Sequence, residues 1–221
     1  MSAINNDKHF VWVWIPKNAG SSIYQKLIQY GIFAGNEGAH EQFSELEAHL
    51  CDVDKYFKWA FVRNPYSRIA SAYYHLVKAH NFHAYGTFEE FVLNDFVDKE
   101  GRLSVENSKV KTHSTLHAVY HLQPQSFFLR DHSGKIEFDF IGRVENISED
   151  WKTINKRLGL RDDDKLEVYN RDSVPFLSPE GEKVSDYSKH FLGASATEMI
   201  RIINEIYKDD FENFGYEMLR T

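Results

Sequence analysis

The residues with the clearest chemical potential form a short loop after an apolar run. The loop combines a lysine, a glycine and two serine hydroxyls at a point where a helix is expected to begin. Unpaired N–H groups and the helix dipole make such a helix start favourable for anions. Its members, named here the anion loop, are Pro16, Lys17, Asn18, Ala19, Gly20, Ser21 and Ser22.

The anion loop differs from the phosphate loop of kinases and nucleoside triphosphatases. That loop reads GxxxxGK[ST], whereas this segment has no Gly-Lys pair and places Lys17 ahead of Gly20. The next expected strand ends in Arg63-Asn64-Pro65 and supplies no carboxylate for Mg²⁺. Both departures disfavour phosphoryl transfer, and a P-loop-type small-molecule kinase is kept as an alternative. By itself, the loop is equally compatible with a simple turn that leaves Lys17 in solvent.

A second segment, Phe61 to Leu76, places an arginine at the end of a strand. Arg63 follows the apolar run Lys58–Val62, and ligands of open α/β sheets bind beyond the carboxyl ends of strands. Ser71 lies on a helix face that points away from the apolar stripe of the same helix. Ser71 is therefore either a solvated serine or a hydroxyl that faces a ligand groove.

Together the segments resemble the sulfotransferase superfamily, and most closely the branch of carbohydrate sulfotransferases and bacterial sulfotransferase family 2 proteins. The resemblance follows the family's order and touches most of the chain. The segments that carry it are IPKNAGSS, the Gly38-Ala39-His40 segment, FVRNPYSRIASAYYHL, DFIGRVENISEDW and NEIYKDDFENFGYE.

The resemblance implies a donor, 3'-phosphoadenosine-5'-phosphosulfate, and a role for each anion-binding segment. The anion loop would bind the 5'-phosphosulfate, while Arg63 and Ser71 would bind the 3'-phosphate. Arginine suits this task because its planar fork can hold two phosphate oxygens at once. The product would be adenosine 3',5'-bisphosphate. The family uses no metal, and the sequence contains no HExxH or paired Cys/His spacing typical of zinc.

Two residues are expected to promote transfer of the sulfuryl group to a hydroxyl acceptor, which the family analogy predicts to be a carbohydrate. Lys17 can stabilise the charge that develops on the leaving phosphate. His40 is the predicted base, because related carbohydrate sulfotransferases place a catalytic histidine in the corresponding segment. A solvent-exposed loop histidine is the alternative reading of His40, and His49 is a weaker candidate. A catalytically inactive nucleotide- or carbohydrate-binding protein is a further alternative, disfavoured because Lys17 and His40 are both present.

The elements that must position these residues alternate between strands and helices. This alternation predicts an α/β fold, and the resemblance implies a P-loop-like three-layer architecture with a central, mostly parallel sheet flanked by helices. Asn64 is expected to cap a helix whose first residue is Pro65. Strands are expected at 9–15, 58–62, 126–129 and 138–144, and helices at 21–30, 41–50, 65–76, 87–96, 148–159 and 194–207.

Residues 1–8 are expected to form a flexible tail and residues 9–221 a single domain. The polar segment 101–111 is a candidate lid over the site. Arg68 is expected to form a structural ion pair, with a supporting role at the site as the alternative, and Arg143 either pairs with a glutamate in a turn or supports the site. The sequence assigns no chemical task to Gln123, to Gln125 or to the remaining histidines.

The composition of the chain bears on its partners and on the cellular compartment in which it works. The chain has 221 residues and a formal net charge of -7, which does not indicate a nucleic-acid partner. Cys51 is the only cysteine, so no internal disulfide can form, which fits a reducing compartment. The run Phe10–Ile15 is too short to cross a membrane. We therefore expect a cytoplasmic enzyme without membrane insertion; no feature of the sequence indicates its oligomeric state.

Overall fold

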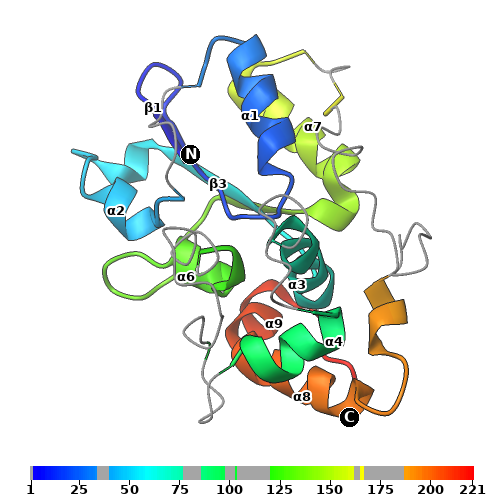
Figure 1. Ribbon diagram of the computed structural model, residues 1–221. Helices are drawn as coiled ribbons and strands as arrows, with labels where there is room; N and C mark the ends of the chain where they lie inside the picture. The colour runs from blue at the N-terminus through cyan, green and yellow to red at the C-terminus, as the bar shows by residue number, and fades with distance from the viewer. Residues whose placement is uncertain are drawn as a thin grey trace. The chain divides into compact units, whose positions relative to one another are not determined.

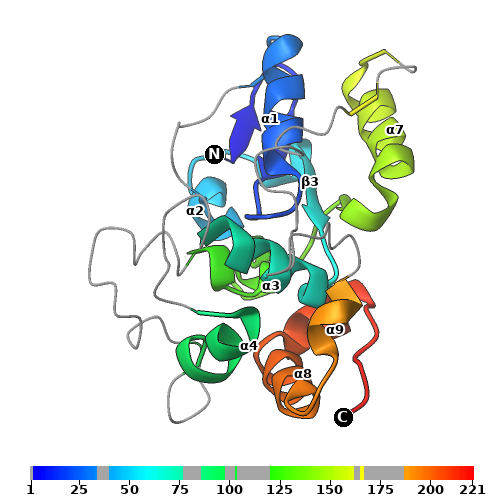
Figure 2. The ribbon, with the colours of Figure 1, turned by 45° about the vertical axis from the view of Figure 1, so that its right-hand side comes forward.

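The structure is a computed structural model that describes residues 2–33, 40–76, 86–97, 103, 120–161, 165–166 and 187–221. The chain divides into two compact units. Figures 1 and 2 show the ribbon from two directions, coloured from the N-terminus to the C-terminus. Unit 1 comprises Met1–Arg63 and Gln125–Asn170, and unit 2 comprises Asn64–Pro124 and Arg171–Thr221. That residues 9–221 form a single domain stays a prediction.

Unit 1 is built on a four-stranded sheet with the order β1-β2-β3-β4. β1 is antiparallel to β2, whereas β3 is parallel to both β2 and β4. The mostly parallel sheet with its helices confirms the predicted α/β class. The strands are β1 Ala3–Asn5, β2 Phe10–Val13, β3 Phe57–Val62 and β4 Phe140–Arg143.

The first residues of the chain join this sheet, so the predicted flexible tail is wrong for β1. Ala3 is buried and pairs with Trp12 in the ladder. The side-chain amide of Asn5 donates to the carbonyl oxygen of Ile32 at 2.8 Å. The strand depends on pairing with the adjacent β2 and on the bond to Ile32, and the polar composition of residues 1–8 indicates neither.

Aromatic side chains on one face of the sheet hold two helices against it. Alternate residues of a strand point to the same face, so Phe10, Trp12 and Trp14 share a face that Trp59 and Phe61 extend across β3. The helices are α1 Gly20–Gln29 and α7 Ile147–Leu158, and Figure 1 shows both beside the sheet. The buried cluster contains Phe10, Trp12, Trp14, Trp59 and Phe61 from the strands, Ile23 and Leu27 from α1, and Trp151 and Ile154 from α7.

The described part of unit 1 also contains two short helices and the 3-10 helical turns η1 Val53–Lys55 and η5 Val144–Asn146. α2 Phe43–Glu47 is shorter than predicted and begins with a capping box, in which the N–H of Gln42 donates to Glu45 at 2.8 Å. Residues 126–129, predicted as a strand, belong instead to the helix α6 Gln125–Leu129. A short apolar run does not distinguish a strand from a buried helical turn, and the preceding Pro124 is well tolerated at a helix start.

The named elements that the structure describes in unit 2 are helices and helical turns. Asn64 caps its first helix, because the side-chain Oδ1 accepts from the N–H groups of Tyr66 at 3.0 Å and Ser67 at 3.3 Å. This confirms the predicted cap. The elements are α3 Pro65–Tyr74, α4 Phe88–Glu90, the π-helical turn η4 Phe91–Asp95, η6 Tyr187–Phe191, α8 Ala196–Ile206 and α9 Lys208–Phe214.

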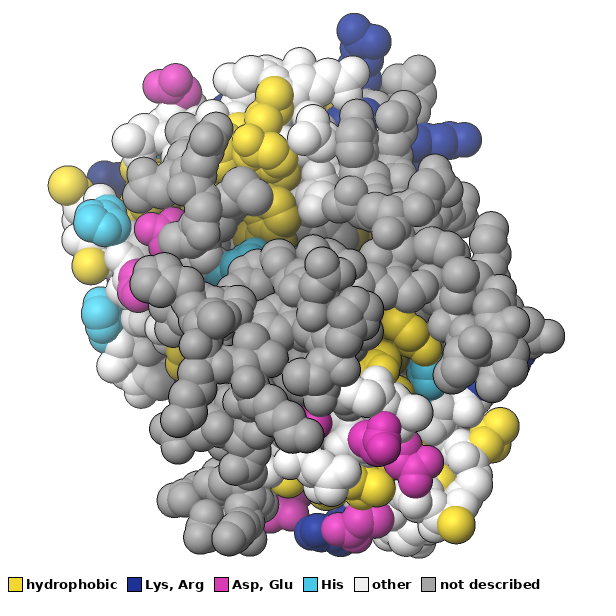
Figure 3. All heavy atoms as spheres, in the orientation of Figure 1, with side chains coloured by type: hydrophobic (Ala, Val, Ile, Leu, Met, Phe, Trp, Pro, Cys, Tyr) yellow, Lys and Arg dark blue, Asp and Glu magenta, His cyan; other side chains and the backbone are white. Residues whose placement is uncertain are grey.

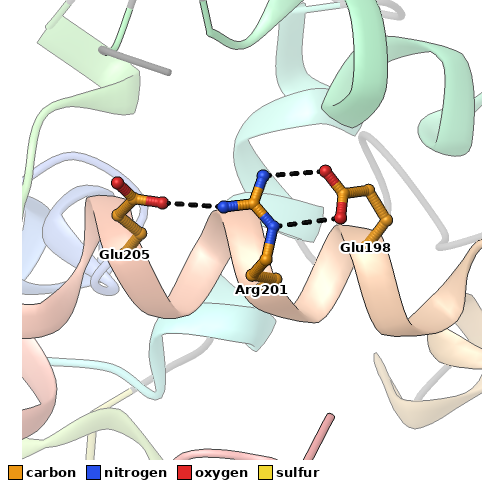
Figure 4. A network of polar contacts seen from close by, with 3 residues as sticks. All are labelled: Glu198, Arg201 and Glu205. Atoms are coloured by element: carbon orange, nitrogen blue, oxygen red, sulfur yellow. Dashed lines mark hydrogen bonds and ion pairs between the residues drawn. The ribbon is translucent and has the colours of Figure 1, made fainter. Parts of the chain in front are cut away.

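The predicted C-terminal helix is confirmed as α8, which buries Met199 and Ile203 in the core of unit 2. Acidic side chains gather near α4 and α8 on the surface that Figure 3 shows. On α8, Arg201 forms ion pairs with Glu198 at 2.8 Å and Glu205 at 3.0 Å (Figure 4). All three side chains are exposed, so this network contributes little to stability.

The predicted lid, residues 101–111, lies outside the described residues except for Leu103, which forms a β-bridge with Val97. Among the helices that the structure describes, none has the length and apolar character needed to cross a membrane.

Gly142 gives a test of the packing in unit 1. A Cβ at this position would lie 2.6 Å from the ring of Phe61. We expect Gly142→Ala to lower the free energy of unfolding by about 1–3 kcal/mol, because the ring is fixed in the aromatic cluster. Urea denaturation followed by tryptophan fluorescence measures the change. Lys152→Ala, which removes an exposed ion pair with Glu149, should stay within about 0.5 kcal/mol of the unchanged protein. An equally small effect in both variants would contradict the close contact.

Candidate functional site

The anion loop and Arg63 leave the sheet at the same edge. β2 and β3 are parallel, with Val13 opposite Ala60, so the residues after both strands lie beyond their carboxyl ends. The guanidinium Nη1 of Arg63 donates to the carbonyl oxygen of Lys17 at 3.3 Å. The structure therefore brings together the two segments that the sequence predicts to bind the donor's anionic groups.

The backbone of the anion loop is unusual at two positions. Lys17 has a φ of 70° and Ala19 a φ of 60°, although this left-handed region costs a residue other than glycine about 1 kcal/mol or more. Ala19 directly precedes the right-handed turn of α1. A change of hand between neighbouring residues turns successive N–H groups toward one side and forms a concave anion site.

The start of α1 supplies the donors for such a site. The carbonyl oxygen of Ala19 accepts from the N–H groups of Ser22 at 3.0 Å and Ile23 at 3.2 Å. The N–H groups of Gly20 and Ser21 precede these donors, and the first N–H groups of a helix have no acceptor within it. Lys17 and Ser21 are half-buried, whereas Ser22 is buried.

Gly20 is needed for the packing of the anion loop against Trp14. A Cβ at Gly20 would clash with the indole ring of Trp14, mainly at Nε1. The indole is large, rigid and 6% exposed, so it has little freedom to move aside. Any larger residue at this position would displace either Trp14 or the anion loop.

Trp14 also holds His40, the predicted base. The Nδ1 atom of His40 lies 3.2 Å from the carbonyl oxygen of Trp14, and the two rings meet edge to face at 5.7 Å. Because a carbonyl can only accept, Nδ1 carries the hydrogen in this contact. In the neutral imidazole, Nε2 is then the nitrogen that can accept a proton. Trp14 thus links the orientation of His40 to the position of Gly20.

An aromatic surface extends from Trp14 along α1. The ring of Trp14 lies 5.8 Å from Tyr24, whose ring meets Phe33 edge to face at 4.8 Å. Tyr24 and Phe33 are half-buried, and Figure 3 shows a strip of hydrophobic side chains beside α1. Flat, partly exposed rings of this kind can pack against a purine base or a sugar ring.

Gln125 is a site residue that the sequence reasoning missed. It is wholly buried, and its Oε1 accepts from the side-chain Nδ2 of Asn18 at 2.7 Å and from the N–H of Arg63 at 2.8 Å. Its Nε2 donates to the carbonyl oxygen of Arg63 at 2.8 Å. The family-like Gln123-Pro124-Gln125 was the only signal in the sequence, and it names no partner.

Asn18 belongs to the same network and is 2% exposed. Besides its bond to Gln125, its Nδ2 donates to the carbonyl oxygen of Phe61 at 2.8 Å. The two side-chain amides therefore attach the anion loop to the end of β3. We name this set of hydrogen bonds between Asn18, Gln125, Phe61 and Arg63 the amide clamp.

The remaining predicted residues lie apart from the anion loop in the sequence. Ser71 is half-buried on α3 of unit 2 and stays out of the apolar core, as its spacing predicts. Its binding of the 3'-phosphate stays a prediction. The side chain of Arg143 is exposed, and its N–H donates to the carboxylate of Asp150 at 2.6 Å, at the start of α7.

Arg68 has contacts typical of a structural residue in the core of unit 2. It is 1% exposed, donates to the carbonyl oxygen of His121 at 3.2 Å and lies over the ring of Tyr207 at 5.9 Å. Burial lowers the pKa of Arg68, while the negative charge of the nearby Asp210 counteracts this effect. Among the residues that the structure describes, no group of three His, Cys, Asp or Glu side chains could hold a metal ion.

Comparisons with known proteins give one match. Searches among curated proteins and among solved structures found no similar protein. A model of the family described as the sulfotransferase family matches residues 2–217. The match covers nearly the whole chain, from β1 to the residues that follow α9, and includes the anion loop, His40, Arg63 and Gln125. The chain therefore belongs to the sulfotransferase family.

Proposed function

We propose that this sulfotransferase takes its sulfuryl group from 3'-phosphoadenosine-5'-phosphosulfate and transfers it to the hydroxyl of an acceptor, which we expect to be a carbohydrate. The contact between Arg63 and the anion loop carries the proposal. It places a second cationic residue beside Lys17 and the N–H groups at the start of α1. A donor with one phosphate beside its transferable group and another on the ribose matches this concentration of positive charge.

The arrangement of β2, the anion loop and α1 supports a P-loop-like fold as part of the proposal. A strand leads into a short loop, and the loop opens a helix whose first N–H groups would face a bound anion. The loop would hold the 5'-phosphosulfate. Arg63, together with Ser71, would hold the 3'-phosphate that distinguishes this donor from ATP.

In the proposed reaction, the acceptor oxygen attacks sulfur in line with the bond to the 5'-phosphate. The new S–O bond forms as the old one breaks, and negative charge develops on the leaving phosphate oxygen. Lys17 and the N–H groups of α1 stabilise that charge. His40 takes the hydroxyl proton at Nε2, while the carbonyl oxygen of Trp14 holds the hydrogen on Nδ1.

The residue that follows β3 disfavours the kinase alternative. The strand ends at Val62, and Arg63 follows it where a kinase of this architecture would place a carboxylate for Mg²⁺. A protein that has lost catalysis is disfavoured by the presence of both Lys17 and His40. We also propose a cytoplasmic location, because Cys51 is the only cysteine of the chain.

The choice between donor and ATP can be measured directly. We expect isothermal titration calorimetry to show binding of adenosine 3',5'-bisphosphate and negligible binding of ATP, with or without Mg²⁺. The reason is that Arg63 offers a cationic fork for a ribose phosphate, and the anion loop lacks the Gly-Lys pair of ATP-binding loops. Mg²⁺-dependent ATP binding without bisphosphate binding would instead support the kinase.

Lys17 should matter more to turnover than to affinity. Lys17→Ala is expected to lower kcat for transfer by about 100-fold or more, because the charge that develops on the leaving phosphate loses the ammonium group proposed to stabilise it. The Kd for adenosine 3',5'-bisphosphate should rise by less than about tenfold. Lys135→Ala, which removes an exposed lysine, is the control and should leave both quantities unchanged. A Lys17 variant with normal turnover would refute the assignment.

His40→Ala should lower kcat by about 10²–10⁴-fold while donor affinity stays nearly intact. A base must be neutral to accept a proton, so kcat of the unchanged enzyme should fall as the pH drops into the acidic range. That acidic limb should disappear from the pH profile of the variant. His49→Ala is the matched control, because His49 is exposed and follows α2. Equal turnover in the His40 and His49 variants would remove His40 as the base.

A further inference from the structure

Gln125 continues the ladder of β3 by one residue. The strand ends at Val62. The N–H of the next residue, Arg63, donates to Oε1 of Gln125, and the carbonyl oxygen of Arg63 accepts from Nε2, both at 2.8 Å. A primary amide presents a donor and an acceptor side by side, as a neighbouring strand does. The side chain thereby fixes the backbone of Arg63 without any regular strand pairing.

The same amide reaches the anion loop. Its Oε1 accepts a second hydrogen bond, from Asn18 at 2.7 Å, and Asn18 lies between the two residues with left-handed backbone, Lys17 and Ala19. A strained loop persists only where its surroundings hold it in place. Gln125 thus acts on both segments that are expected to contact the donor.

We propose that Gln125 is a positioning residue that sets the distance and orientation of Arg63 relative to the anion loop, and through them the affinity for the donor. The proposal rests on the proposed function for its donor, but the amide clamp itself can be tested without any ligand. Gln125 contributes no charge to the site. Its effect depends on one donor and one acceptor presented together, and this requirement separates it from a residue that merely fills space.

Three substitutions distinguish these roles. Gln125→Met keeps the approximate volume and loses every hydrogen bond, so it should weaken binding of adenosine 3',5'-bisphosphate by about tenfold or more. Gln125→Ala should do the same, with an additional loss of stability. In Gln125→Glu, an ionised carboxylate would repel the carbonyl oxygen of Arg63, because both groups are hydrogen-bond acceptors. A protonated carboxyl group can instead donate a hydrogen bond to that oxygen.

The glutamate variant therefore predicts a pH-dependent rescue. Burial and the opposing carbonyl oxygen of Arg63 raise the pKa of a carboxyl group at this position, whereas the N–H donors of Arg63 and Asn18 lower it. The bisphosphate affinity of Gln125→Glu should therefore approach that of the unchanged protein as the pH falls and the carboxyl group becomes protonated. The ratio of the two Kd values cancels the titration of the ligand itself. The Met variant should show no such recovery, and neither should Gln29→Ala, an exposed glutamine on α1 that serves as control.

Hydrogen–deuterium exchange reports on the amide clamp in the absence of ligand. Peptides that cover residues 14–24 and 60–66 should exchange faster in Gln125→Met, because both segments lose their attachment. Peptides from α7 should be unchanged, and so should all peptides of Gln29→Ala.

The two measurements separate failure of this inference from failure of the proposed function. If the unchanged protein does not bind the bisphosphate, the proposed function is wrong, and the exchange of the two segments alone decides the amide clamp. If it binds, then equal affinity and equal exchange in the Met variant overturn the inference.

Discussion

The parallel ladder between β2 and β3 runs from Phe10 opposite Phe57 to Val13 opposite Ala60. Parallel pairing sends both strands toward the same edge of the sheet, so the two loops that follow them emerge as neighbours. An antiparallel arrangement of the same strands would place the anion loop and Arg63 at opposite edges. The contact between Arg63 and Lys17 and the amide clamp both depend on this strand direction.

The ladder fixes where the loop begins, but other contacts fix its shape. Lys17 and Ala19 occupy a backbone region that glycine would enter more easily. The loop therefore has a conformational cost at both positions, but it keeps a side chain at each. Trp14 occupies the space beside Gly20, and Asn18 is bound to β3. A loop held on two sides in this way is preorganised, which reduces the reorganisation needed when an anion binds.

Much of this arrangement follows from patterns that are local in the sequence. The run of apolar residues before Pro16, the cap at Asn64 and the stripe of α8 each depend on residues a few positions apart, and each was predicted. The contact of His40 with Trp14 and the hydrogen bonds of Gln125 depend on partners far along the chain. Propensity and periodicity contain no information about such partners. For that reason Gln125 was assigned no task, and its helix α6 was mistaken for a strand.

The amide clamp also joins the two places where the chain leaves unit 1 and returns to it. Unit 1 ends its first part at Arg63 and resumes at Gln125, and Asn18 lies 107 positions before the glutamine that binds it. Domains generally fold as units while the chain emerges from the ribosome. The anion loop is made early, but the residue that attaches it is made only after the segment 64–124 has been synthesised. During synthesis, the site should therefore acquire its final shape late, so that a truncated chain lacking α6 would carry every residue of the anion loop without the contacts that hold it.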